Sequence, residues 1–315
     1  MSRKFITAGS VIIDYIIPYG HETRPGIRRG GGAMYSAQGL RLWEDSVAVA
    51  AYSGKDFGGW YGSWLSENGI DSTGVVKKYV KTRQTNLIYN AEGTFSCIGR
   101  GDEEYVEHPS VIDRELIEPL IGSETVGVHI LAAPEPEIVL PISDLCRQRG
   151  IRFGMEFEVA RLYGRSDNHE LFMELSSYTD YFSINLYEAK RLFPGVRDEK
   201  DALEELRSYG VPCYFRLGTD GALFIGKDRV IRAPMISRFG NVDATGCGNS
   251  STSAVFWAIC NGYSPEECAY IGGVTASVNA GCEGLVPRLT PELRSQCDSL
   301  VHEYVQKHQP SSEKQ

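Results

Sequence analysis

The sequence lacks the patterns that mark membrane proteins, zinc fingers, disulfide-rich domains and basic nucleic-acid-binding proteins. No run of about 18 apolar residues occurs, so we expect no transmembrane helix. The 8 cysteines are scattered without a C-x-x-C pair, which argues against a zinc site or a disulfide framework. With 32 basic and 41 acidic residues, the net charge is −9. Nucleic acid and membranes are therefore not expected as partners, although a local phosphate pocket is compatible with this charge.

The first residues of the chain also lack the features of a secretion signal. Asp14 interrupts the short apolar stretch that follows Lys4, and no small-residue cleavage site comes after it. We therefore expect a cytoplasmic protein with reduced thiols. At the other end, residues 308–315 are polar, which predicts a frayed C-terminal tail.

The sequence does contain a globular composition and a regular alternation of strand and helix patterns. The chain has 315 residues, of which 42% are apolar and 23% are charged. This alternation predicts a mostly parallel sheet with helices on both faces, which is a three-layer α/β/α arrangement. The predicted strands are Val126–Leu131, Arg152–Phe157 and Cys213–Leu217, and the predicted helices are Glu137–Arg149 and Asp198–Tyr209.

One region departs from this alternation. Thr85–Asn90 and Thr94–Gly99 flank a short turn without an intervening helix, which favours a β-hairpin. Together with the strand-like Ile12–Tyr19, they predict a small second sheet. We therefore predict a single domain over residues 1–307, with a β appendage at about 11–35 and 80–102.

A glycine-rich turn precedes a predicted late helix. Thr245–Asn249 leads into a run with helical periodicity that ends at Asn261–Gly262. Backbone N–H groups at such a helix start are unpaired, and the helix dipole favours negative charge there. The turn is therefore suited to phosphate, although a tight loop that only starts a helix has the same pattern.

The segment around this turn resembles the C-terminal signature of the PfkB (ribokinase-like) carbohydrate kinases, Asp-Thr-x-Gly-Ala-Gly-Asp. In that family the glycines form an anion hole and the last Asp is the general base. The resemblance therefore implies an anion hole at Gly246, Cys247 and Gly248, and it places Asn249 at the general-base position. The residues on matching positions are Asp243, Thr245, Gly246 and Gly248.

Other segments resemble the family in the same order along the chain. They are Gly9 with Asp14, Gly31–Gly32, Tyr52–Gly58, Ile70–Val75, Asn185–Glu188 and Gly218–Gly221. The resemblance implies a ribokinase-like fold in which the β appendage is a lid over the site, and relatives often form dimers through this lid. It also implies ATP as the co-substrate, Mg²⁺ and, in some relatives, K⁺.

The resemblance also assigns roles to individual residues. Asp14, Gly31 and Gly32 would hold substrate hydroxyls, and Gly218 and Gly221 would lie near the nucleotide. Asn185 and Glu188 would organise Mg²⁺ directly or through water, and Asp243 would lie near a monovalent cation. From the residues alone, Asn185 with Glu188 is better explained as a helix cap. Asp14 could be a turn residue, but an aspartate inside an apolar strand needs a partner, which favours a functional role.

Several positions depart from the family pattern. An amide at Asn249 cannot accept a proton as a carboxylate does, and loss of a general base costs about 10²–10⁴-fold in rate. Arg216 replaces a common Thr, and Ser36 replaces a sugar-site Asn. Met155–Glu158 replaces Asp-Pro-Asn and offers Glu156 or Glu158 as a carboxylate. Arg216 is a candidate contact for nucleotide phosphates, and the alternative for Arg216, as for Glu156 or Glu158, is a surface ion pair. Cys247 is either a small residue tolerated in the turn or a reactive thiol at a helix N-terminus.

These observations leave three functions open. The first is phosphoryl transfer from ATP to a hydroxyl of a sugar or a sugar-like substrate such as a nucleoside. The second is a catalytically impaired protein that binds sugar or nucleotide, which the amide at Asn249 favours. The third is a divergent enzyme of another class that acts on a sugar phosphate in the same cleft.

Overall fold

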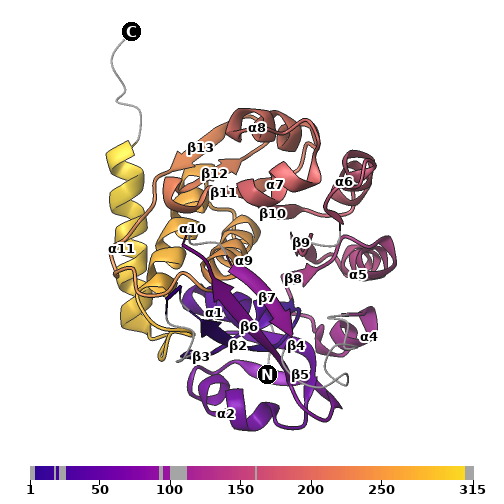
Figure 1. Ribbon diagram of the computed structural model, residues 1–315, viewed down its shortest axis with the longest axis vertical. Helices are drawn as coiled ribbons and strands as arrows, with labels where there is room; N and C mark the ends of the chain where they lie inside the picture. The colour runs from indigo at the N-terminus through magenta and orange to yellow at the C-terminus, as the bar shows by residue number, and fades with distance from the viewer. Residues whose placement is uncertain are drawn as a thin grey trace.

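The structure is a computed structural model that describes residues 4–17, 19–20, 26–91, 95–99, 112–159 and 162–308. Its strands form two sheets, one of nine strands and one of four. Helices cover both faces of the larger sheet, as Figure 1 shows. The predicted three-layer α/β/α domain with a mostly parallel sheet and a small second sheet is confirmed.

The large sheet has the order β13-β12-β11-β10-β9-β8-β1-β4-β5. At one edge, β12 pairs antiparallel with both β11 and β13, and all other neighbours pair in parallel. The strands are β1 (Phe5–Ala8), β4 (Val47–Gly54), β5 (Asp71–Tyr79), β8 (Gly127–Ala132), β9 (Arg152–Phe157), β10 (Tyr181–Asn185), β11 (Cys213–Arg216), β12 (Ala222–Ile225) and β13 (Val230–Ala233).

Successive side chains of each strand enter two different core clusters. In β9, Phe153, Met155 and Phe157 pack in one cluster. Gly154 faces the other side, where it lies against Phe256. The helices of that second side are α1 (Gly32–Trp43), α2 (Phe57–Glu67), α9 (Cys247–Cys260), α10 (Pro265–Ala280) and α11 (Pro291–His308). The first side carries α4 (Arg114–Ile117), α5 (Pro136–Arg149), α6 (Asn168–Ser176), α7 (Leu186–Leu192) and α8 (Glu199–Ser208).

Strand β1 lies at the point where the strand order reverses. Its neighbours are β4 on one side and β8 on the other, so the chain builds the sheet outward from β1 in both directions. In open α/β sheets, the crevice beyond the carboxyl ends of the strands at such a point is the usual ligand site. Gly9 follows β1 there, and a Cβ on Gly9 or Gly32 would press against Leu131 of β8.

The small sheet has the order β3-β2-β6-β7. Its strands are β2 (Ile12–Ile17), β3 (Gly26–Gly30), β6 (Arg83–Tyr89) and β7 (Phe95–Gly99). β6 and β7 form the predicted antiparallel hairpin, and β2 pairs in parallel with β6. The appendage predicted to extend to residue 35 ends sooner, because α1 begins at Gly32. Residues 92–94 and 100–102 of the predicted hairpin region lie outside the described residues.

The predicted elements of the main domain agree with the structure to within one or two residues. Helix α5 ends at Gly150, whose φ of 67° is the left-handed conformation that glycine adopts most easily. Helix α10 begins with the capping box of Ser264 and Glu267. Helix α11 ends at His308, and the remaining tail lies outside the described residues.

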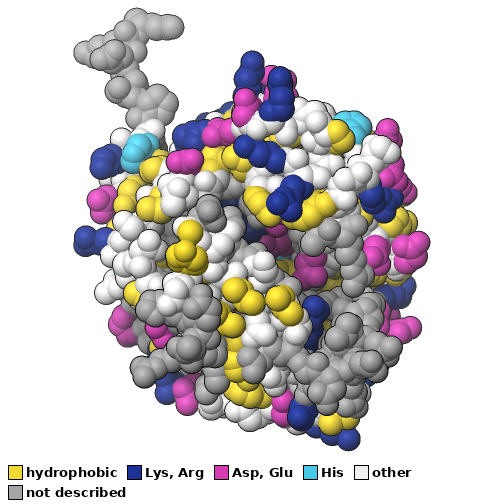
Figure 2. All heavy atoms as spheres, viewed as in Figure 1, with side chains coloured by type: hydrophobic (Ala, Val, Ile, Leu, Met, Phe, Trp, Pro, Cys, Tyr) yellow, Lys and Arg dark blue, Asp and Glu magenta, His cyan; other side chains and the backbone are white. Residues whose placement is uncertain are grey.

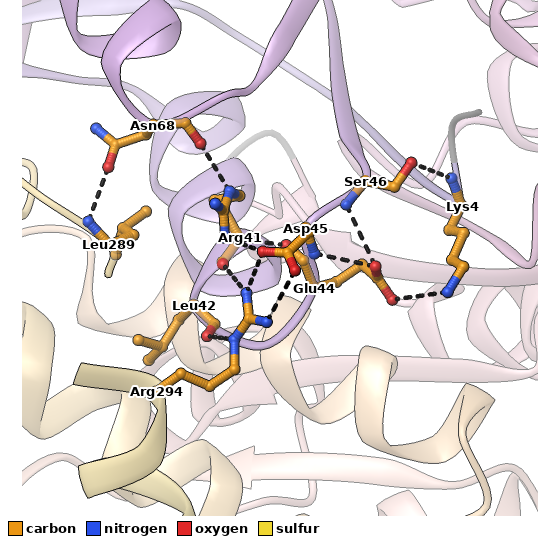
Figure 3. Close-up of polar contacts among 9 residues, drawn as sticks. All are labelled: Lys4, Arg41, Leu42, Glu44, Asp45, Ser46, Asn68, Leu289 and Arg294. Carbon is orange, nitrogen blue, oxygen red and sulfur yellow. Dashed lines mark hydrogen bonds and ion pairs between the residues drawn. The ribbon is translucent and has the colours of Figure 1, made fainter. Parts of the chain in front are cut away.

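A cluster of polar contacts ties α11 to the C-terminal end of α1 (Figure 3). Arg294 of α11 donates to the carbonyl of Leu42 at 2.7 Å and to Asp45 at 2.9 Å. Arg41 donates to the carbonyl of Asn68 at 2.6 Å, and Asn68 accepts from the N–H of Leu289 at 2.8 Å. These contacts satisfy carbonyls at the end of α1 and so fix the helix whose other end carries Gly31 and Gly32.

The described helices include none that is both long and apolar enough to cross a membrane. The cysteines whose side chains the structure describes are free thiols.

Candidate active site

Three neighbouring strands of the large sheet carry polar side chains at their carboxyl ends. Glu156, Asn185 and Arg216 lie at the carboxyl ends of β9, β10 and β11. Tyr214, two residues before Arg216, packs in the cluster of α9, and Asn185 and Arg216 are paired in register. Because side chains alternate along a strand, all three project towards the N-terminal end of α9.

Arg216 pairs with two carboxylates in this group. Its Nη1 lies 2.9 Å from Glu156 Oε1, and its Nη2 lies 3.6 Å from Glu188 Oε2. The Arg216 side chain is 14% exposed, and a Cβ on Gly248 would overlap its Nη1. Burial opposes the charge of this guanidinium, but the two glutamates hold the pKa of Arg216 above its ordinary value. The guanidinium therefore lies directly beside the glycine turn of α9.

Asn185 and Glu188 form a helix cap. The N–H of Glu188 donates to Asn185 Oδ1 at 2.8 Å, and the N–H of Asn185 donates to Glu188 Oε2 at 2.8 Å. Burial raises the pKa of Glu188 despite the nearby Arg216. The capping interpretation is thus confirmed, and the role of the pair towards Mg²⁺ stays a prediction. Among the described residues, no group of three or more His, Cys, Asp or Glu is arranged to hold a metal ion.

The glycine turn opens α9 without a side-chain cap. Gly246 has a φ of 81°, a conformation that favours glycine, and the N–H of Cys247 donates to the carbonyl of Ala244 at 3.2 Å. Gly248 and Asn249, both half-buried, follow in the first turn. This geometry is the helix start that the sequence analysis predicted for an anion site.

Residues of α10 and the preceding loop hold this turn in place. Asp243 accepts from the N–H of Thr245 at 3.0 Å and from that of Gly284 at 3.3 Å. Asn279 donates to the carbonyl of Thr245 at 2.8 Å and to the sulfur of Cys247 at 3.3 Å. Asp243 therefore shapes the turn, and its role towards K⁺ stays a prediction.

The surroundings of Cys247 favour the protonated form of its thiol. Burial raises its pKa to about 11, although the hydrogen bond from Asn279 acts in the opposite direction. The structure therefore favours a small residue accommodated in the turn over a reactive thiol at a helix N-terminus.

Asp14 lies in β2 of the small sheet and is buried, with only 7% of its surface exposed. The hydroxyl of Thr85 donates to its Oδ1 at 2.5 Å across the β2–β6 pairing. Burial is the largest influence and raises the pKa of Asp14, while Thr85, Arg83 and the N–H of Gly31 act in the opposite direction. A buried aspartate with this set of partners is built into the site and is not a simple turn residue.

The ring of Tyr35 joins the two halves of the site. A Cβ on Gly30 or on Gly246 would overlap this ring, which is 1% exposed. Burial is the largest cause of the raised pKa of the Tyr35 phenol, followed by the charges of Asp243 and Asp14. The Tyr35 ring therefore contacts both Gly30 of the small sheet and the glycine turn of α9.

The remaining predicted residues lie around this centre. Gly31 is the N-cap residue of α1 and has a φ of 84°, and a Cβ there would overlap the backbone of Ile12. Gly218 and Gly221, with φ of 64° and 87°, bound the short 3₁₀ turn that follows Arg216. A Cβ on Gly221 would overlap the carbonyl of Ala233, so this turn requires glycine for close approach.

Ser36 does not line the site. Its Oγ accepts from Thr7 at 2.8 Å and lies 3.0 Å from Nδ1 of His129, in the buried layer beneath α1.

Asn249 contacts a carboxylate that comes from another element. Its Nδ2 donates to Glu156 Oε2 at 3.1 Å. The Glu156 side chain is 6% exposed and lies between Asn249 and Arg216. The position that departs from the family pattern is thus in contact with a carboxylate from a different strand.

Sequence reasoning missed three residues that build the site. Thr85, Tyr35 and Asn279 were not assigned to it, because their contacts join segments far apart in the chain. The only available signal was Asp14, since an aspartate in an apolar strand requires a donor.

The surface of the molecule is hollowed near the middle of the face that Figure 2 shows. The hollow lies between α7 and β7, with acidic and basic side chains at its floor.

Comparison with known proteins agrees with this geometry. Residues 3–291 match the pfkB family of carbohydrate kinases. A ribokinase from Arabidopsis thaliana is 25% identical over 286 residues, covering 84% of this chain and 70% of that enzyme. A nucleoside kinase from Methanocaldococcus jannaschii is 31% identical over 122 residues, which cover 38% of this chain and only 39% of that kinase.

Solved structures show the same fold. The ribokinase of A. thaliana, complexed with ribose and ATP, superimposes with a TM-score of 0.71 and 19% identity, covering 96% of this chain and 99% of that chain. The M. jannaschii nucleoside kinase gives a TM-score of 0.67 and 21% identity, covering 98% and 99%. The adenosine kinase of Sinorhizobium meliloti gives a TM-score of 0.74 and 18% identity, covering 95% of this chain and 99% of that chain. With a family match over nearly the whole chain and a site built on the family's own turns, this protein belongs to the pfkB family of carbohydrate kinases.

Proposed function

We propose that this protein transfers the γ-phosphoryl group of ATP to a hydroxyl of a sugar or a nucleoside. The observation that carries the proposal is the Tyr35 ring, which lies against Gly30 at the end of β3 and against Gly246 in the glycine turn of α9, with Asp14 near enough for its charge to act on the phenol. A hydroxyl held at Asp14 and a phosphate held at the glycine turn would meet beside this ring. The ribose and ATP named for the A. thaliana ribokinase support this class of substrates.

Each part of the site has a task in this reaction. Asp14, with Gly31 and Gly32, holds and orients hydroxyl groups, because a buried carboxylate accepts strong hydrogen bonds. The turn Gly246–Gly248 stabilises the charge of the transferring phosphoryl group. Nucleotide phosphates extend towards Arg216, and the 3₁₀ turn bounded by Gly218 and Gly221 lies beside the nucleotide.

In this proposal, Mg²⁺ binds to the protein together with ATP, as part of the Mg–ATP substrate. Glu188 Oε2 and Asn185 Oδ1 already serve the helix cap, and Arg216 lies beside the carboxylate. These residues therefore influence an ion on the phosphates through water or through the remaining carboxylate oxygen. A monovalent cation such as K⁺ would be held near Asp243.

The small sheet acts as a lid in this proposal and as the surface for a homodimer. Ile98 of β7 and Val80 beside the lid are 52% and 56% exposed. Apolar side chains on an outer sheet favour pairing with a second copy.

A non-catalytic binding protein is the second candidate, and Asn249 is the observation that favours it. The experiment is a thermal-shift screen against sugars and nucleosides with and without Mg–ATP, followed by a coupled assay of ADP release. Stabilisation by an acceptor together with acceptor-dependent ADP release is the expected result. Stabilisation without ADP release would instead support the binding protein.

A further inference from the structure

We propose that Glu156 is the carboxylate that accepts the proton of the substrate hydroxyl, in place of the residue at position 249. This role rests on the proposed phosphoryl transfer. It makes Glu156 a catalytic residue that comes from β9 and not from the glycine turn.

The first step is position. Glu156 Oε2 lies 3.1 Å from Asn249 Nδ2, in the first turn of α9. Gly248, the preceding residue of that turn, lies beside Arg216 Nη1, which is itself 2.9 Å from Glu156 Oε1. The carboxylate thus lies beside the proposed anion hole, one hydrogen bond away from the position of the family's general base.

The second step is the direction of the Asn249 amide. A carboxylate only accepts hydrogen bonds, so the amide nitrogen must be the atom that faces Glu156. The amide oxygen then points away from Glu156. Asn249 can accept a hydrogen bond from a substrate hydroxyl through this oxygen and orient it, although it cannot take the proton.

The third step is charge. Arg216, Glu188 and the phenol of Tyr181 are the titratable groups that act on Glu156 or on its ion pair. An aspartate at position 249 would place a second carboxylate against Glu156 without a proton between them. Like charges at such a distance oppose each other's ionisation, and an amide at one of the two positions removes this repulsion. This chain has the carboxylate at 156 and the amide at 249.

The proton and the electrons balance in this arrangement. The O–H bond of the acceptor breaks and its proton moves to Glu156. The acceptor oxygen forms a bond to the γ-phosphorus of ATP. The bond from that phosphorus to the β–γ bridging oxygen breaks, and its electron pair leaves with ADP.

The test exchanges the two groups. Glu156→Gln is expected to lower kcat by about 10²–10⁴-fold and to remove the acidic limb of the pH profile of kcat/KM. Asn249→Asp alone is expected to give no gain, because two carboxylates then compete for one proton. The double variant, Glu156→Gln with Asn249→Asp, is expected to regain at least about tenfold over Glu156→Gln, together with the acidic limb. Glu156→Asp keeps a carboxylate and is expected to keep the limb at a reduced kcat.

The control is Glu118→Gln, which removes a surface carboxylate 2.9 Å from Arg114 and is expected to leave kcat and the pH profile unchanged. ATP binding by calorimetry shows that each variant is folded. A Glu156→Gln variant that binds ATP and retains kcat and the acidic limb overturns the role of Glu156 while the kinase function stands. A wild-type protein that releases no ADP with any acceptor overturns the proposed function and this role together.

Discussion

At the scale of single residues, Asp14 is a carboxylate whose burial disfavours its ionised form in the folded chain. Its carboxylate is buried at 7% exposure, and its partners are the Thr85 hydroxyl and the N–H of Gly31. These donors do not replace the water that the carboxylate loses, because the pKa of Asp14 is raised by burial above its ordinary 3.8. Buried carboxylates with a raised pKa are typical of functional sites, which agrees with the proposed role of Asp14.

The pKa of Asp14 leads to a dependence of stability on pH. The pKa is higher in the folded chain than in the unfolded chain, so the folded state binds the proton more tightly. Its contribution to stability is therefore fully present below the unfolded value and is lost as the pH rises through the folded value. Urea unfolding of the wild type and of Asp14→Asn between about pH 4 and pH 8 checks this expectation. The stability of the wild type relative to the variant should fall as the pH rises, and a constant or rising difference would contradict it.

The same scale shows what can be predicted about a site from one sequence. Asn249 and Arg216 stand out in the chain because each replaces a residue of a known pattern. Their contacts with Glu156 were not predictable, since the three residues come from α9, β11 and β9. A pattern identifies a residue that differs, and only the packing of strand ends identifies the side chains that this residue contacts.

At the scale of elements, the N-terminal turn of α9 depends on two separate properties of Gly246. Its φ of 81° is unfavourable for other residues, and its Cα faces the Tyr35 ring without space for a Cβ. Gly262, after the same helix, has a similar φ of 76° and no atom within 4 Å of an added Cβ. Alanine variants at these two glycines therefore distinguish the cost of the left-handed backbone conformation from the cost of contact with Tyr35.

Gly246→Ala should consequently lose more stability than Gly262→Ala. The left-handed conformation costs about 1–2 kcal/mol in both variants. Overlap with Tyr35 should add about 1–3 kcal/mol at Gly246 only, as overpacking of a filled space does. Urea denaturation of both variants gives the two free energies of unfolding, and ADP binding to Gly246→Ala should be weaker as well. Equal losses in the two variants would show that the Tyr35 contact has no energetic weight.

Elements with a local cause were predictable, and pairings between distant elements were not. Helix α5 ends at Gly150 and α10 starts at its capping box, because the residues that end or begin them are neighbours in the sequence. The parallel pairing of β2 with β6 joins Asp14 to Thr85, 71 residues apart. Nothing in the periodicity of either strand specifies that partner, since each strand only shows which of its faces is apolar.

At the scale of the whole molecule, the small sheet must be held in a fixed place over the main one. The chain passes from β5 to β6 through Lys81 and Thr82, which lie against the turn between β4 and α2. Asp56 in that turn accepts from the N–H and the hydroxyl of Thr82, each at 2.7 Å, and from the Trp60 indole at 3.1 Å. A Cβ on Gly54 would overlap this connection. The turn that resembles a family motif in the sequence thus anchors the strand that carries Thr85.

Asp56→Ala should therefore weaken acceptor binding through the position of the small sheet. Without the carboxylate, the N–H and the hydroxyl of Thr82 lose their acceptor in a buried place, which costs about 1–3 kcal/mol of stability. The KM for the acceptor should rise, because β6 also carries Thr85, the partner of Asp14. The KM for ATP should change little, since the Gly218–Gly221 turn follows β11, near the opposite edge of the sheet. Steady-state kinetics and urea unfolding measure both effects.

The matched control for this variant is Asp144→Ala, which removes an exposed carboxylate 3.3 Å from Arg147 and should change neither KM. A rise of both KM values in Asp56→Ala would indicate a general loss of structure, and an unchanged acceptor KM would show that the connection does not position the small sheet. A rise in the acceptor KM alone would show that acceptor binding depends on the position of the small sheet relative to the main sheet. The affinity for the acceptor would then depend on the connection between the sheets as well as on the residues that contact the acceptor.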